Sequence, residues 1–143
     1  MNPTYNLERF LSAQESVYDT ALNELRNGKK LSHWMWFIFP QIAGLGQSEI
    51  SKYYAIKDIN EARAYLNHSV LGKRFEECLN AVLSCNTNNP VRIFGDIDAL
   101  KFHSCLTLFL NANPENQLIQ DALSKFYGTT DFATDNILDN QHY

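Results

Sequence analysis

Apolar residues recur at intervals of three and four along most of the chain, and no segment alternates apolar and polar residues as a half-buried strand does. This pattern is typical of amphipathic α-helices. It predicts helices at about 6–27 (or two pieces broken near 12–14), 49–54, 58–66, 70–82, 96–112 and 114–127, with one more turn after 131.

Residues that favour helix ends stand at the borders of these segments. Gly28 and Gly128 each follow the last apolar position of a helix, where glycine commonly ends one. The clearest loop lies at 86–90. The side chains expected to cap helix starts are Asn6, Ser32, Ser48, Asp58, Ser69 and either Asp96 or Asp98.

The most apolar stretch is SHWMWFIFPQ at residues 32–41, which contains both tryptophans of the protein. It is too short to span a bilayer and too apolar for a surface, so we expect it at the centre of the core. A short helix that begins at Ser32 and is limited by Pro40 is favoured. A buried strand is the alternative, because Trp, Phe and Ile also favour strands. No second segment offers pairing, however, and a lone buried strand leaves its backbone groups without partners.

These elements predict an all-α protein. We expect a single compact domain over residues 1–143, with about seven or eight short helices around the buried aromatic helix. A chain of 143 residues is close to the usual size of one domain and can bury a substantial core.

Composition and charge exclude several classes of function. The net charge is −4 and the pI is about 5.5, which argues against general nucleic-acid binding and against binding to an anionic membrane. The sequence shows neither a signal peptide nor a transmembrane stretch, so we expect a soluble, cytoplasmic protein. The cysteines Cys78, Cys85 and Cys105 lie in helical apolar patterns without a CxxC pair or a histidine cluster. We therefore expect reduced thiols, no metal and no cofactor.

The aromatic string at 32–41, followed by GLGxS at 44–48, resembles an uncharacterised family, the domain of unknown function 1810. Further matches lie at 7–10, 13–14, 54–56, 61–66, 68, 71–72, 93–95, 101, 104 and 107–109. The resemblance implies a mainly helical fold in a soluble, largely bacterial protein, and no established activity. The label calpastatin-like, which such proteins sometimes carry, has no support in these residues. Ser69 departs from the family pattern by replacing a frequent proline, and His103 by replacing an expected arginine, a permanent cation.

His33 is the first candidate for chemistry. One residue inside a helix start, its imidazole could act as a general acid or base near neutral pH. The alternative is a buried histidine whose ring is hydrogen-bonded to a backbone carbonyl. Trp34 could stack on a base or sugar ring, although core packing is favoured in so apolar a run. Trp34 and Trp36 lie on different sides of a helix, so at most one of them lines a pocket.

The turn Gly44-x-Gly46-x-Ser48 leads into a helix and could cradle an anion with its backbone N–H groups and one hydroxyl. It is neither a Walker loop nor a dinucleotide fingerprint, and no strand precedes it. A plain tight turn with a serine cap is the alternative. Gln41 lies between the aromatic run and this turn, and would either bind a ligand or hold the loop shut.

Lys101 and Ser104 lie on the polar side of the predicted helix at 96–112. The simplest interpretation is a solvated face. Leu100 and Leu108 lie on that side as well, so we expect it to be partly covered, with a lysine that could neutralise an anion held by the glycine turn. His68, just before a predicted cap, is interpreted as structural.

The first functional hypothesis is a site for an anionic small molecule, phosphorylated or nucleotide-like. It would be built from His33, Trp34, Gln41, Gly44, Gly46, Ser48, Lys101 and Ser104. The architecture is loosely similar to NAD- and ADP-ribose-linked helical domains, an analogy of fold alone. If the protein is an enzyme, hydrolysis or group transfer at a glycosidic or phosphoryl centre suits it best, with His33 as acid or base. The second hypothesis is a non-catalytic module for protein interaction or regulation, whose partner the sequence does not specify.

Overall fold

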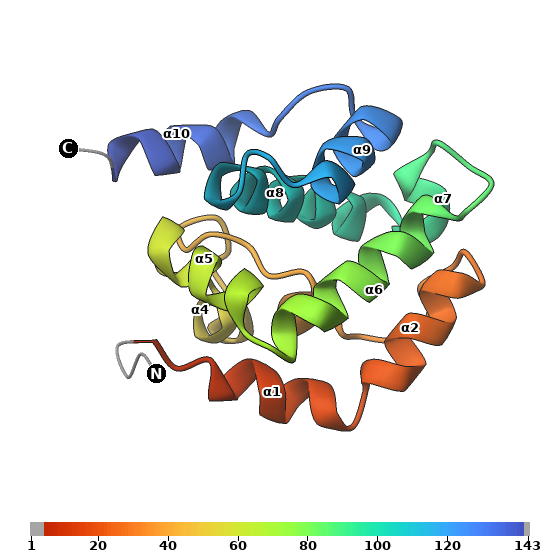
Figure 1. The fold of residues 1–143 in the computed structure, drawn as a ribbon, viewed down its shortest axis with the longest axis horizontal. Helices are drawn as coiled ribbons and strands as arrows, with labels where there is room; N and C mark the ends of the chain where they lie inside the picture. Colours follow the sequence, from red (N-terminus) through yellow and green to blue (C-terminus); the bar gives the residue numbers. More distant parts are fainter. Residues whose placement is uncertain (1–4, 142–143) are drawn as a thin grey trace.

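The computed structural model describes residues 5–141, and within that range the chain is all-α (Figure 1). Across those residues the only strand-like pairing is a single parallel bridge between Ile42 and Ile56. The ten helices of residues 5–141 are α1 (Glu8–Glu15), α2 (Tyr18–Arg26), α3 (Met35–Ile38), α4 (Glu49–Tyr54), α5 (Ile59–Asn67), α6 (Leu71–Leu83), α7 (Pro90–Phe94), α8 (Asp96–Ala112), α9 (Gln117–Phe126) and α10 (Phe132–Asn140).

The long helix α8 runs through the middle of the fold. Helices α5, α7, α9 and α10 pack against it, and Figure 1 shows it with α9 and α10 above and α5 and α6 below. Of the two leucines on its predicted polar side, Leu108 is fully buried and Leu100 is exposed. A helix that is buried on nearly all sides along its middle is a core helix, and the exposed residues of α8 lie in its first turns and, at its other end, at Asn111.

Aromatic side chains fill the core around Phe39, at the end of the apolar run. Its ring centroid lies 5.8 Å from that of Phe75, 6.1 Å from that of Phe94 and 4.8 Å from that of Phe102, each with edge-to-face geometry. Edge-to-face pairs are favoured because the positive edge of one ring meets the negative face of the other. The prediction that the aromatic run occupies the centre of the core is confirmed by Trp34 and Phe39, which have no exposed surface, but it is wrong for His33, which is exposed, and Trp36 is only half-buried.

The helix within the aromatic run is shorter than expected. It covers only Met35–Ile38, and the alternative of a buried strand is wrong. The prediction that Ser32 caps it is also wrong, because Trp34 occupies the N-cap position with no side-chain cap. The Ser32 hydroxyl instead donates a hydrogen bond of 2.6 Å to the Glu24 carboxylate. Because α3 begins only at Met35, Ser32 is not at the N-cap position, and its hydroxyl donates instead to this charged acceptor.

The predicted helix at 6–27 is two helices. The break lies between Glu15 and Tyr18, slightly later than the expected position at 12–14. The break allows α1 to pack against α3 while α2 packs against α6.

The predicted caps are right at two helices and wrong at the others. Leu7 and Gly95, rather than Asn6 and Asp96 or Asp98, occupy the N-cap positions of α1 and α8, and neither helix has a side-chain cap. Ser48 accepts from the N–H of the third residue of α4 at 3.2 Å, and Asp58 accepts from the N–H of Glu61 at 2.9 Å. Ser69 does not cap α6, because the Nδ1 atom of His68 accepts from the N–H groups of residues 70 and 71 at 3.1 and 3.3 Å. The structural interpretation of His68 is thus confirmed.

The prediction of seven or eight helices omits α7 and makes α10 too short. Helix α7 begins at Pro90, at the end of the expected loop, where the Asn89 side chain accepts from the N–H of Val91 at 3.0 Å. Proline suits the first position of a helix because its missing N–H would have no partner there. Helix α10 has 9 residues rather than one turn, and Asp131 caps it.

Candidate functional site

A small pocket lies between the end of the aromatic run and α4. Its volume is about 90 Å³. Three of the residues predicted from the sequence, Gln41, Gly44 and Gly46, contribute to it. The full lining is Trp36, Gln41, Ile42, Ala43, Gly44, Gly46, Ser51, Lys52, Tyr54 and Ala55. We call it the Trp36 pocket.

The loop that carries the two glycines is fixed by its backbone. The Ile56 N–H donates to the carbonyl of Gln41, and the Ala43 N–H donates to the carbonyl of Ile56, both at 2.8 Å. Gly46 lies so close to α4 that a Cβ atom there would approach the Cβ of Ser51 to 2.6 Å. Glycine is required at this position by the close approach of the loop to the helix. The glycine turn therefore forms a defined wall of the pocket.

The serine hydroxyls beside the turn are already used within the fold. The Ser48 hydroxyl donates to that of Ser51 at 3.0 Å in addition to capping α4, and the Ser51 hydroxyl donates to the Ser48 carbonyl at 2.8 Å. Ser48 does not contribute to the pocket lining. At Ser48 the geometry therefore matches a plain tight turn with a serine cap.

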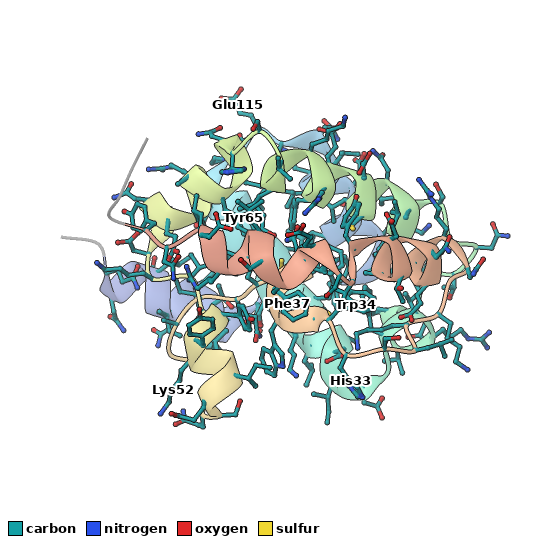
Figure 2. All side chains as sticks on the ribbon, turned by 90° about the horizontal axis from the view of Figure 1, so that it is seen from below. His33, Trp34, Phe37, Lys52, Tyr65 and Glu115 are labelled. Atoms are coloured by element: carbon teal, nitrogen blue, oxygen red, sulfur yellow. The ribbon has the colours of Figure 1, made fainter. Side chains whose placement is uncertain are left out.

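Four polar side-chain groups in the lining of the Trp36 pocket have no hydrogen-bond partner within residues 5–141. They are the indole N–H of Trp36, the amide of Gln41, the ammonium of Lys52 and the hydroxyl of Tyr54. Figure 2 shows Lys52 on α4 at the edge of the molecule. Because pairing within the fold has not used these groups, they are available to a ligand.

Lys101 is connected to the pocket through Trp36. Its ammonium lies 3.8 Å from the centroid of the Trp36 ring and 3.4 Å from Oδ1 of Asp98. The other carboxylate oxygen of Asp98 binds Lys30 at 2.8 Å. A lysine over a tryptophan face gains a cation–π attraction. Lys101 is not itself part of the lining, but it contacts the residue that forms the wall.

Three further predicted residues lie away from this pocket. His33 is exposed, and its ring makes no hydrogen bond within residues 5–141, so the interpretation as a buried, carbonyl-bound histidine is wrong. Figure 2 shows it at the surface, apart from Lys52. Trp34 is fully buried, as core packing requires. Ser104 is buried as well and donates to Asp131 at 3.1 Å, which joins α8 to the start of α10.

Glu24 holds Trp34 in place. Its carboxylate accepts from the Trp34 indole N–H at 2.8 Å, from the N–H groups of Leu31 and Ser32 at 2.8 and 3.0 Å, and from the Ser32 hydroxyl. Burial by itself raises the pKa of this carboxyl, but the four hydrogen bonds outweigh burial and lower the pKa from 4.5 to about 2. Sequence reasoning missed Glu24; its place beside Leu25, at the edge of an apolar helix face, is the only sign in the sequence.

The cysteines offer no reactive nucleophile. All three are free, with Cys78 and Cys105 buried and Cys85 half-buried. Burial raises the pKa of the Cys78 thiol to about 12 and also raises the pKa values of Cys85 and Cys105. All three thiols are therefore protonated at neutral pH.

Neither a metal cluster nor a membrane-spanning segment is found in the part of the chain that the structure describes. No three His, Cys, Asp or Glu side chains among residues 5–141 are grouped to hold a metal ion. No helix in the same range has the length and apolar character needed to cross a bilayer.

Comparison with known proteins identifies similar chains. A family described as a protein of unknown function (DUF1810) matches residues 4–138. The crystal structure of the conserved hypothetical protein Rv1873 from Mycobacterium tuberculosis is similar over 95% of this chain and 98% of that chain, with 42% identity and a TM-score of 0.93. No curated protein matches.

Proposed function

Because this chain belongs to the DUF1810 family of proteins of unknown function, the geometry of its pocket is the guide to its role, and we propose that it binds a small phosphorylated or nucleotide-like molecule there. One observation carries this proposal. The Trp36 pocket holds four polar groups that have no partner within residues 5–141. A partly enclosed site with an aromatic wall and a few unpaired polar groups is typical of small-molecule binding.

The pocket is too small to enclose a whole ring. Its volume is about 90 Å³, whereas pockets for drug-sized ligands span roughly 300–1,000 Å³ and a closed cavity of about 150 Å³ holds one benzene molecule. A whole nucleotide does not fit inside. In this proposal one edge of a base or sugar ring enters beside Trp36, and the rest of the ligand lies outside the mouth.

Lysines supply positive charge for a phosphate. Lys52 contributes to the lining, Lys101 lies on the Trp36 ring, and the lining contains no carboxylate. Lys52 would attract a phosphate at the mouth directly, while Lys101 would first have to leave Asp98, 3.4 Å away. Derivatives of ADP-ribose combine rings with phosphates and are therefore among the first ligands to test.

Binding rather than catalysis is the role that we propose for this pocket. A hydrolase or transferase at a glycosidic or phosphoryl centre needs a general acid or base close to the reacting atoms. The lining contains no histidine, carboxylate or thiol. His33, the residue considered for that task, is exposed and outside the lining. The proposed site therefore relies on Trp36 and Gln41 and leaves His33 out.

Isothermal titration calorimetry with AMP, ADP-ribose, ribose 5-phosphate and adenosine tests the proposal. At least one phosphorylated ligand should bind saturably. Trp36→Leu should weaken that binding roughly tenfold or more, because stacking contributes about 1–3 kcal/mol per base. His33→Ala is the matched control, since His33 belongs to the same segment but not to the pocket, and it should bind as the wild type does.

Two results would contradict the proposal: no saturable binding of any of the phosphorylated ligands, or wild-type affinity in Trp36→Leu. Weaker binding in His33→Ala together with normal binding in Trp36→Leu would assign the His33 imidazole, rather than Trp36, to the binding site.

A further inference from the structure

A second hollow lies at the other end of the molecule. In Figure 1 the end of α2, the loop after α6 and α7 come together on the right, whereas α4 lies on the left. The hollow has a volume of about 500 Å³, and neither aspartate nor glutamate contributes to its lining. Arg26 and Arg92 line it together with Asn27, Asn86 and Thr87. We call it the arginine bowl.

The two arginines of the bowl differ from the other arginines of residues 5–141. Arg9, Arg63 and Arg74 each donate to a carboxylate, carbonyl or amide oxygen of another element, at 2.9, 3.1 and 3.2 Å respectively. Arg26 and Arg92 make no hydrogen bond and no ion pair within that range. The guanidinium groups that the fold leaves without partners are thus the ones that line the bowl.

Three cations lie at the helix ends around the bowl. An arginine in the last turn of a helix is favoured by the helix dipole without any ligand, and both Arg26 and Arg92 occupy such positions. A third cation already serves the end of α6, however. Lys125 donates to the carbonyls of Leu83 and Cys85 at 2.8 Å each. The end of α6 beside the bowl is therefore capped by Lys125, and neither Arg26 nor Arg92 donates to it.

We infer that the arginine bowl binds the phosphate group of a small phosphorylated molecule. A guanidinium presents parallel N–H donors that match phosphate oxygens. The amides of Asn27 and Asn86 and the hydroxyl of Thr87 line the same hollow and can donate further hydrogen bonds. The bowl and the Trp36 pocket have no lining residue in common, so this inference does not depend on the proposed function.

A free phosphorylated molecule suits the bowl better than a nucleic acid or a membrane does. Nucleic-acid backbones and anionic lipid surfaces are bound by extended basic surfaces, and this chain has a net charge of −4. The positive charge of the bowl is local, and its volume of about 500 Å³ lies within the range of small-molecule pockets.

An NMR titration of the full chain with pyrophosphate tests the inference, read from the Nε–H signals of the arginines. The signals of Arg26 and Arg92 should shift saturably, while those of the other arginines should not. Arg26→Gln and Arg92→Gln should each raise the dissociation constant roughly tenfold, and the double variant should show no saturable binding. Lys73→Gln removes the same charge from an exposed site on α6 outside the bowl and should bind as the wild type does.

Trp36→Leu should also keep pyrophosphate binding at the bowl, which separates this inference from the proposed function. Wild-type binding by the double variant would overturn the inference, as would equal shifts at all arginines. Single-stranded RNA and vesicles of phosphatidylcholine and phosphatidylserine are titrated in parallel. If RNA or the vesicles bind more tightly than pyrophosphate, and the double variant loses that binding, the assignment to a small molecule is overturned. Because both arginines are exposed, circular dichroism should show an unchanged fold in these variants.

Discussion

Trp34 and Trp36 lie two residues apart in one apolar run, yet their surroundings differ. Trp34 has no exposed surface, and its indole N–H donates to the buried carboxylate of Glu24. Trp36 is half-buried, its indole N–H has no partner within residues 5–141, and Lys101 lies on its ring. Around Trp34 the polar groups are paired with one another and hold the fold together. Around Trp36 several of them stay available, which is what a binding site requires.

Among substitutions that test the difference between the two tryptophans, removal of the Glu24 carboxylate beside Trp34 should have the largest effect on stability. Glu24→Ala leaves four donors near Trp34 without their acceptor, and we expect the free energy of unfolding to fall by roughly 3–5 kcal/mol. Urea unfolding followed by circular dichroism measures this loss. Glu24→Gln keeps the volume and one acceptor oxygen, so it should lose less. A midpoint unchanged in Glu24→Ala would show that the carboxylate does not hold the Trp34 region.

Low pH should lower the free energy of unfolding through the protonation of Glu24. The loss should be smaller than in Glu24→Ala, because a protonated carboxyl still fills the site. The pKa of Glu24 is lowered from 4.5 to about 2 in the folded protein. The stabilisation is therefore complete above about pH 4.5 and is lost as the pH falls toward about 2, since the unfolded chain takes up the proton first. Urea titrations at several pH values should show this decline in the wild type and a smaller one in Glu24→Gln. Equal declines would assign the acid sensitivity to other carboxyls.

Single substitutions of the two tryptophans should give the smallest but most direct comparison. Trp34→Phe removes a buried hydrogen bond and leaves a small cavity, so we expect a loss of about 2 kcal/mol. Trp36→Phe should cost less than about 1 kcal/mol. Each variant retains one tryptophan, and iodide should quench the emission of Trp36 but not that of Trp34. Equal quenching or equal stability losses would remove the distinction between the two regions.

Part of the site could be predicted from the sequence. Gln41, Gly44 and Gly46 line the Trp36 pocket as expected, because a polar residue and a glycine turn beside an apolar run are local features. The expectation that at most one tryptophan lines a pocket holds, with Trp36 in that position. Tyr54 and Lys52 were missed, since α4 meets the turn only through tertiary packing.

The sequence by itself determined the all-α fold class, most of the helices and the burial of the aromatic run, because periodicity and capping act between neighbours along the chain. The tertiary structure alone decided which polar groups pair. Ser32 has the local preference of a cap, yet its hydroxyl donates to Glu24 in α2. Arg26 and Arg92 meet at one hollow although α2 and α7 are far apart in sequence. Such pairings depend on how helices pack in three dimensions, and helix packing is set by side-chain surfaces that meet only in the folded state.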